Sequence, residues 1–257
     1  MNKHRFVWHD LNTTDVDSAK KFYGEVFKWT YESSDNGPYV HIKAGDKMIG
    51  GMRKMEAHEK SPPNWLGYIG VDDVAATAAK VTSLNGTIYM PPLAMENVGT
   101  FAVAADPTGG VFAPWKSARP GEDVESLGPP ALNTFSWDEL SSTDPAAACA
   151  FYAKLFGWEP QAMDMGQGMI YTLLQRPGVK NGKGEQVAAG GVMKTPPGLP
   201  SFWLPYVQVD NTDALCEKAE RLGAQVMVPP TDIPNVGRFA CWSDPQKASI
   251  AVIQMPR

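Results

Sequence analysis

Apolar side chains recur at helical spacing in four stretches of the chain. The first stretch follows Asp15 and the second follows Asp144, and aspartate is a favoured residue just before a helix. The other two stretches start near Asp72 and Asp210. Their apolar positions are Ala19, Phe22, Tyr23, Val26, Phe27; Ala148, Phe151, Tyr152, Leu155, Phe156; Val74, Ala78, Val81; and Leu215, Ala219, Leu222. We interpret these positions as the core-facing sides of four helices.

Short strand patterns surround each of these helices. One apolar segment precedes each helix, several follow it, and Gly and Pro turns separate them. The predicted order is therefore β-α-β-β-β, repeated four times. This order predicts an α+β protein.

The second half of the chain repeats the first. Residues 6–11 (FVWHDL) return as residues 135–140 (FSWDEL), and the segment 15–29 returns as 144–158. Further on, residues 65–72 return as 203–210, and residues 91–107 return as 229–245. Self-similarity over this length, in an unchanged order, indicates a tandem duplication.

The limits of the two halves follow from the repeat and from composition. We predict a first domain over residues 1–117, with modules at about 4–56 and 64–117. Residues 118–130, rich in Pro, Gly and acidic residues, are typical of a linker. The second domain is predicted over residues 131–257, with modules at about 132–195 and 201–256.

The repeated motifs resemble those of the vicinal-oxygen-chelate superfamily, which contains glyoxalases, bleomycin-resistance proteins and extradiol dioxygenases. Residues 8–11 (WHDL) and 137–140 (WDEL), each followed by a helix with a Phe-Tyr pair, resemble the opening of its modules. The later segments NVGTFA and NVGRFA resemble its second modules. The resemblance implies two cup-shaped curved sheets with the helices outside, as in two-domain glyoxalase-like or hydroxylase-like bacterial proteins. One such scaffold hosts unrelated chemistries, so the activity stays open.

The resemblance also implies where a metal would be bound. Its ligand positions correspond to Trp8, Tyr39, Leu66 and Ala113 in the first half, and to Trp137, Tyr171, Leu204 and Ala251 in the second. None of these is a usual metal ligand, so no cofactor is predicted. A divalent metal is the alternative, and it requires a shifted strand register that brings His9 or His41 into the cup. The chain has no histidine after residue 132.

Carboxylates and aromatic side chains are the other candidates for chemistry. Strand alternation places Asp10 on the face of Trp8, and Glu139 on the face of Trp137. Each carboxylate is a candidate acid–base group, or alternatively a structural acceptor of backbone N–H groups near the following helix. The aromatic residues predicted to line the cups are Trp8, Tyr39, Tyr68, Trp115, Trp137, Tyr171 and Tyr206.

We therefore predict a protein that binds a small aromatic or amphipathic molecule in aromatic-lined cups. One alternative is a lyase, isomerase or hydroxylase that uses Asp10 or Glu139. A second is a metal-dependent glyoxalase or dioxygenase that uses His9 or His41. Arg238, which follows the second NVG segment, is a further candidate contact for an anionic ligand.

Composition limits the partners and the compartment. A formal net charge of -5 argues against nucleic-acid binding. No apolar run is long enough for a membrane helix, and the N-terminus does not resemble a signal peptide. The three isolated cysteines fit a reducing compartment, and Cys149 and Cys216 fall at buried helix positions. We expect a cytoplasmic monomer or homodimer whose partner is a small molecule.

Overall fold

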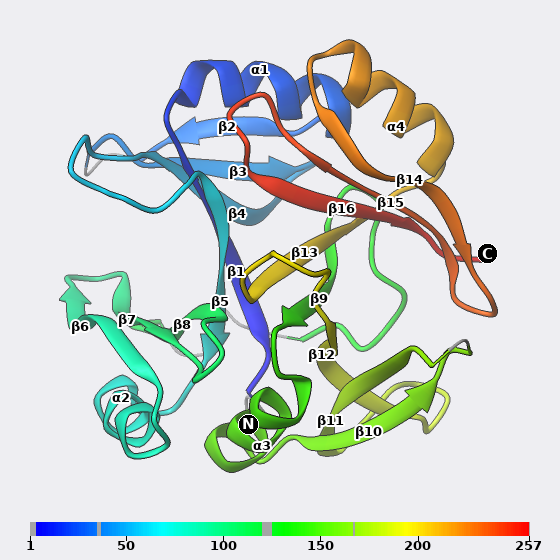
Figure 1. Ribbon diagram of the computed structural model, residues 1–257. Helices are drawn as coiled ribbons and strands as arrows, with labels where there is room; N and C mark the ends of the chain where they lie inside the picture. Colours follow the sequence, from blue (N-terminus) through cyan, green and yellow to red (C-terminus); the bar gives the residue numbers. More distant parts are fainter. Residues whose placement is uncertain (1–3, 35–36, 120–124, 167, 257) are drawn as a thin grey trace. The chain divides into compact units, whose positions relative to one another are not determined.

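A computed structural model describes residues 4–34, 37–119, 125–166 and 168–256. The order β-α-β-β-β occurs four times (Figure 1), which confirms the α+β fold class and the duplication. The first half contains β1 (Phe6–Thr13), α1 (Val16–Phe27), β2 (Thr30–Ser33), β3 (Val40–Ala44), β4 (Lys47–Lys54), β5 (Asn64–Gly70), α2 (Val74–Ser83), β6 (Thr87–Met95), β7 (Gly99–Ala105) and β8 (Val111–Ser117).

The second half repeats this series. Its elements are β9 (Phe135–Ser142), α3 (Pro145–Phe156), β10 (Glu159–Asp164), β11 (Ile170–Lys180), β12 (Gln186–Lys194), β13 (Phe202–Gln208), α4 (Thr212–Arg221), β14 (Gln225–Ile233), β15 (Gly237–Ser243) and β16 (Ser249–Gln254). None of the helices in the described ranges is long and apolar enough to cross a membrane.

Each helix begins at a side-chain cap. Asp15 accepts a hydrogen bond from the backbone N–H of Ser18, and Asp144 caps α3 in the same way. The second helix is capped by Asp73 in the first half and by Asn211 in the second half. Each cap lies one residue later than the aspartate at which the sequence pattern begins. These side chains satisfy N–H groups that have no partner within the helix.

The helical stripes are buried as predicted in α1, α2 and α3. In α4 the buried residues are Thr212, Cys216 and Ala219, while Leu215 and Leu222 are only partly buried against the core. The three cysteines are buried and free, which confirms the prediction for Cys149 and Cys216.

The strands form two eight-stranded mixed sheets, one for each half. Their orders are β2-β3-β4-β1-β5-β8-β7-β6 and β10-β11-β12-β9-β13-β16-β15-β14. Within a module the outer three strands are antiparallel, and the last of them pairs in parallel with the opening strand, as β4 does with β1. The opening strands of a half therefore lie in the middle of its sheet.

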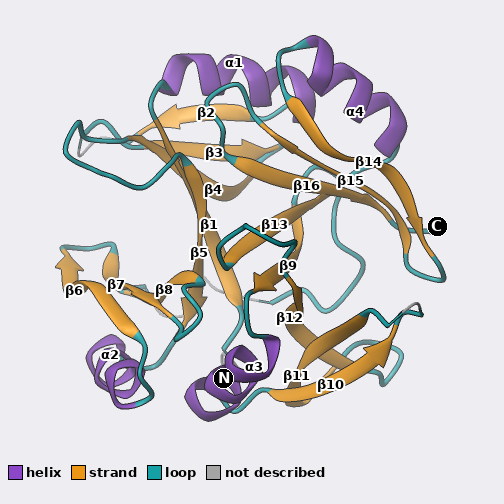
Figure 2. Ribbon diagram, viewed as in Figure 1, coloured by secondary structure: helices purple, strands orange, loops and turns teal. Residues whose placement is uncertain are grey.

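The compact units of the molecule are not the two halves. One unit combines residues 8–66 with residues 130–137 and 204–257, so the first module packs with the fourth. In this unit α1 and α4 lie side by side over the outer strands of their modules (Figure 2). The other unit combines residues 1–7, 67–129 and 138–203, and it contains α2 and α3. Each unit has its own apolar core.

A buried Trp–Tyr–Asp group joins the two halves of the chain inside each unit. In one unit, the Tyr23 hydroxyl donates to Asp244 at 2.9 Å and accepts from Trp65 Nε1 at 3.1 Å. Burial and the neighbouring carboxylate raise the pKa of the Tyr23 phenol well above its usual value. These contacts fix which two modules share a core.

The other unit contains the same arrangement. The Tyr152 hydroxyl donates to Asp106 at 3.0 Å and accepts from Trp203 Nε1 at 2.9 Å. The pKa of the Tyr152 phenol is raised by the same two causes, with burial the larger. The duplication thus preserved a buried polar group together with its partners.

Candidate functional site

The opening strand β1 has two chemically different faces. Trp8 and Asp10 share one face, as strand alternation predicted, and the Trp8 indole Nε1 donates to Asp10 Oδ1 at 2.9 Å. The intervening His9 is buried and stacks on Phe135, with ring centroids 4.1 Å apart. The structure therefore has the unshifted register, in which His9 lies on the face opposite Trp8.

Asp10 lies at the centre of a small polar cluster among aromatic rings. The Tyr39 hydroxyl donates to Asp10 Oδ1 at 2.5 Å, and Trp8 Nε1 also contacts the Tyr39 hydroxyl at 3.0 Å. Asp10 is only 7% exposed. Both hydrogen bonds come from aromatic side chains on the same face of the sheet.

A glycine permits this contact between β3 and β1. The strand β4 lies between them, and Gly51 of β4 is paired in register with Asp10. A Cβ atom at Gly51 would lie 1.9 Å from the Tyr39 hydroxyl oxygen, so only glycine leaves room for the ring. The sequence showed Gly50-Gly51 as part of the repeat, without indicating that a tyrosine passes over it.

The second half repeats this close approach. A Cβ atom at Gly191 would lie 2.0 Å from the Tyr171 hydroxyl oxygen, and Gly191 is paired with Glu139. Glu139 is buried. Tyr171 thus lies over the strand next to the carboxylate in the second half, as Tyr39 does in the first.

The two halves differ at the next strand position. His41 lies beside Tyr39 and Trp8, with ring centroids 5.2 and 6.3 Å apart. Its Nδ1 atom is buried and has no hydrogen-bond partner among the described residues. In the second half the corresponding residue is Leu173, because it is paired in register with Gly191, as His41 is with Gly51. The first half therefore carries an imidazole where the second carries an apolar side chain.

The remaining predicted aromatic residues form smaller groups. In one unit Tyr68 contacts Phe101 and Trp115, with centroids 5.8 and 6.1 Å apart. In the other, Tyr206 contacts Phe239 at 6.3 Å, and Trp137 is half-buried on β9. Phe101 and Phe239 were missed by sequence reasoning, although both follow the repeated NVG segment. That all these rings line common cups stays a prediction.

The residues at the metal-ligand positions of the family do not fit a divalent metal. Tyr68 is paired with Ala113, and Tyr206 with Ala251, so neither strand pair offers a nitrogen or carboxylate ligand there. In the part of the chain that the structure describes, no three His, Cys, Asp or Glu side chains are grouped to hold a metal ion.

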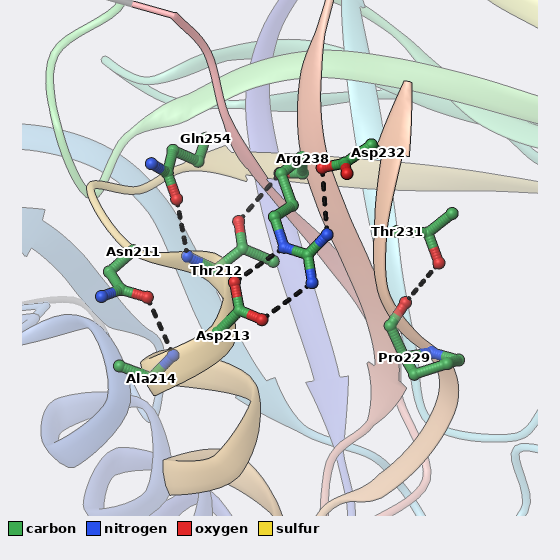
Figure 3. A network of polar contacts seen from close by, with 9 residues as sticks. All are labelled: Asn211, Thr212, Asp213, Ala214, Pro229, Thr231, Asp232, Arg238 and Gln254. Atoms are coloured by element: carbon green, nitrogen blue, oxygen red, sulfur yellow. Dashed lines mark hydrogen bonds and ion pairs between the residues drawn. The ribbon is translucent and has the colours of Figure 1, made fainter. Parts of the chain in front are cut away.

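Arg238 belongs to a network of polar contacts at the N-terminus of α4 (Figure 3). Its guanidinium donates to both carboxylate oxygens of Asp213, at 2.7 and 2.8 Å, and to Asp232 at 3.0 Å. The pKa of Asp213 is lowered by these contacts with the guanidinium. Two carboxylates already compensate the charge of Arg238, and we assign it a structural role linking α4 to the β14–β15 hairpin.

Comparison with known proteins identifies the family. The sequence profile of the Glyoxalase/Bleomycin resistance protein/Dioxygenase superfamily matches residues 5–113 and 134–252. The chain belongs to this superfamily, as its repeated motifs predicted. The two matches coincide with the two halves of the repeat.

Several proteins are similar over nearly the whole chain. A Mycobacterium tuberculosis protein named "Putative glyoxylase CFP32" is 36% identical, with 96% of this chain and 93% of that protein covered. The "Anthracycline biosynthesis protein DnrV" of Streptomyces peucetius is 26% identical, with 97% and 92% covered.

Solved structures show the same fold at low sequence identity. The Mn(II)-bound glyoxalase from Novosphingobium aromaticivorans has a TM-score of 0.61 and 17% identity, with 98% of this chain and 82% of that chain covered. An extradiol ring-cleaving dioxygenase from B. fuscum has a TM-score of 0.67 and 14% identity, with 98% and 72% covered. At these identities the likeness concerns the fold alone.

Proposed function

We propose that this glyoxalase-like protein binds a small aromatic or amphipathic molecule on the sheet face that carries Trp8, Asp10 and Tyr39. The observation that carries the proposal is the buried Asp10 carboxylate, which is hydrogen-bonded to Tyr39 and Trp8 between aromatic rings. Aromatic rings supply apolar contact area, and a few placed polar groups orient the ligand. The proposed recognition requires no metal.

The type of ligand follows from the chemistry of the cluster. Trp8, Tyr39 and His41 offer three ring systems close together, which suits a planar ring. The Asp10 carboxylate can accept a hydrogen bond from a ligand hydroxyl or N–H group. The DnrV relative is named for anthracycline biosynthesis, and anthracyclines are planar, polycyclic and hydroxylated. This name supports a hydroxylated aromatic ligand.

A second candidate function is acid–base catalysis by Asp10. The 2.5 Å hydrogen bond from Tyr39 gives the carboxylate a neighbouring proton donor. A bound ligand could lose a proton to Asp10 or receive one from the Tyr39 hydroxyl. Glu139, next to Tyr171, is the corresponding candidate in the second half.

The test is a titration with 1,8-dihydroxyanthraquinone, a planar probe with two hydroxyl groups. The wild-type protein is expected to bind it, and Asp10→Asn or Tyr39→Phe should weaken binding about tenfold, the effect of one charge-assisted hydrogen bond. Tyr89→Phe is the matched control, because Tyr89 is 63% exposed and lies outside the cluster. Absence of binding, or equal affinity of the Asp10→Asn variant, would refute the proposed binding site.

Chemical analysis after incubation separates the two candidate functions. A binder returns the probe unchanged, whereas an enzyme converts a substrate at a rate that Asp10→Asn abolishes. The adduct of methylglyoxal and glutathione is the substrate to test for glyoxalase activity, since the mycobacterial relative carries that name. Turnover that persists in both Asp10→Asn and Glu139→Gln would exclude these carboxylates as the acid–base groups.

A further inference from the structure

A cavity of about 250 Å³ lies in the unit that contains α3. It lies on the helix-facing side of β11, because Arg176 alternates with Gln175 and shares its face with the core residue Leu174. Tyr171 points to the other face. The residues that line the cavity are His4, Phe156, Gly157, Trp158, Arg176 and Pro177. The cavity is therefore separate from the Tyr171–Glu139 face of the same sheet.

Arg176 places a buried positive charge in the cavity wall. Its side chain is only 2% exposed, and its guanidinium binds both carboxylate oxygens of Glu125, one of them at 2.8 Å. Arg5 lies 3.8 Å from the same carboxylate. A two-pronged contact of this kind matches the planar guanidinium to a planar carboxylate. Arg176 is thus already arranged to hold a carboxylate.

The duplication does not account for these residues. The backbone frame of the cavity is repeated: Trp158 donates to the carbonyl of His4 at 2.9 Å, as Trp29 does to the carbonyl of Asn133 at 2.7 Å. Arg176 itself, however, lies in the segment 175–186, in which the second half is longer than the first, so the repeat gives it no counterpart. The same frame therefore forms around Trp29 without a counterpart of this arginine.

We propose that this cavity binds a small organic anion that has one carboxylate and an aromatic body. The ligand carboxylate takes the place of Glu125 on the Arg176 guanidinium, and the ring lies against Phe156 and Trp158. Arg176 remains paired throughout the exchange, so the buried charge is never left without a counter-ion. Glu125 has a side chain 26% exposed and can move toward water.

The test is a titration with benzoate in which binding is measured by ligand-observed NMR. The wild-type protein is expected to bind benzoate weakly, because Glu125 competes for the same guanidinium. Glu125→Gln should strengthen binding about tenfold, since it removes the competing charge and keeps the arginine. Arg176→Gln should abolish binding. Acetate, which lacks the ring, should bind more weakly than benzoate to every variant that binds.

A second ion pair provides the matched control. Arg53 and Glu59 form the same two-pronged contact at 2.7 and 2.7 Å in the other unit. Glu59→Gln should leave benzoate binding unchanged, because Arg53 does not line the cavity. Equal or weaker binding by Glu125→Gln than by wild type would overturn the proposal, even if Arg176→Gln fails to fold. Unchanged binding by a folded Arg176→Gln would also overturn it.

Discussion

The buried Trp–Tyr–Asp groups are the same in the two copies of the duplication, whereas the residues on the faces of the sheets differ between them. In the two cores the Tyr–Asp distances are 2.9 and 3.0 Å, and the Trp–Tyr distances are 3.1 and 2.9 Å. On the sheet faces Asp10 is matched by Glu139 and His41 by Leu173. Arg176 at the cavity lies in the longer segment of the second half and has no counterpart in the first.

The difference has a physical reason. A buried polar group that loses a partner costs the full desolvation free energy of that group, so substitutions in the cores are strongly selected against. On the sheet faces the buried pair Asp10 and Glu139 keeps a carboxylate, whereas the type of side chain changes between His41 and Leu173, which are partly exposed and can change with a smaller effect on stability. The cores therefore preserve the architecture, and the sheet faces and the cavity carry the residues in which the two halves differ.

The largest effect is expected from replacing the core aspartates. Asp244→Ala removes the acceptor of Tyr23 and of the backbone N–H groups of Gln246 and Ala248. Asp106→Ala removes the acceptor of an equivalent set in the other unit. Each change should lower the free energy of unfolding by roughly 3 kcal/mol or more, measured by urea unfolding.

The comparison between the cores makes this prediction sharper. Because the two groups match, the two losses should agree within about 1 kcal/mol. Asp213→Asn is the control, since its side chain is 52% exposed and the loss of its surface pair with Arg238 should lower stability far less than either core change. Two very unequal losses would contradict this prediction and would mean that groups of the same geometry contribute differently to the free energy of unfolding.

Alkaline pH is expected to have the next largest effect. The pKa values of Tyr23 and Tyr152 are raised by burial in the folded protein, while phenols in the unfolded chain ionise near pH 10. The folded state keeps protons that the unfolded state loses, so stability falls as the pH rises from about 10 toward the folded-state pKa. The slope is at most about 1.4 kcal/mol per pH unit for each tyrosine.

The two units should differ in this response. Burial also raises the pKa of Tyr31, which lies in the same unit as Tyr23. That unit should lose its amide hydrogen-exchange protection at a lower alkaline pH than the unit with Tyr152. A Tyr23→Phe variant should have a shallower dependence on pH above about 10. An unchanged dependence would contradict the assignment of this proton to Tyr23.

A smaller effect is expected at the two glycines under the tyrosine rings. Gly51→Ala and Gly191→Ala each place a methyl group against a tyrosine ring, so the ring must move. We expect a loss of about 1 kcal/mol for each, as for a local overpacking. The melting temperature measures the loss, and Tyr39→Leu should restore part of it in Gly51→Ala. Gly182→Ala is the control, because its Cβ would meet no atom within 4 Å; an equal loss there would refute the steric cause.

Much of the fold could be predicted from the sequence, because its signals are local or repeated. Helical spacing located the four helices, and the Asp15 and Asp144 caps marked where the first helix of each half begins. Strand alternation placed Trp8 and Asp10 on one face, where they form a hydrogen bond. The repeat supplied the duplication, and its motifs identified the family.

The contacts within the candidate site could not be predicted in the same way. Tyr39 reaches Asp10 by crossing over Gly51, and no periodic pattern encodes that crossing. Arg176 and Glu125 are 51 residues apart, and neither belongs to a repeated motif that predicts their pairing. Such contacts depend on the lateral order of strands and on the course of the linker.

The sequence by itself determined the number of modules, their elements and the faces of their strands, since these follow from spacing, capping and alternation along neighbouring residues. Only the tertiary structure decided that the first module shares its core with the fourth and the second with the third. The Tyr23–Asp244 hydrogen bond spans 221 residues. Modules with the same fold offer similar apolar faces, so the choice of partner rests on packing and buried hydrogen bonds between distant segments.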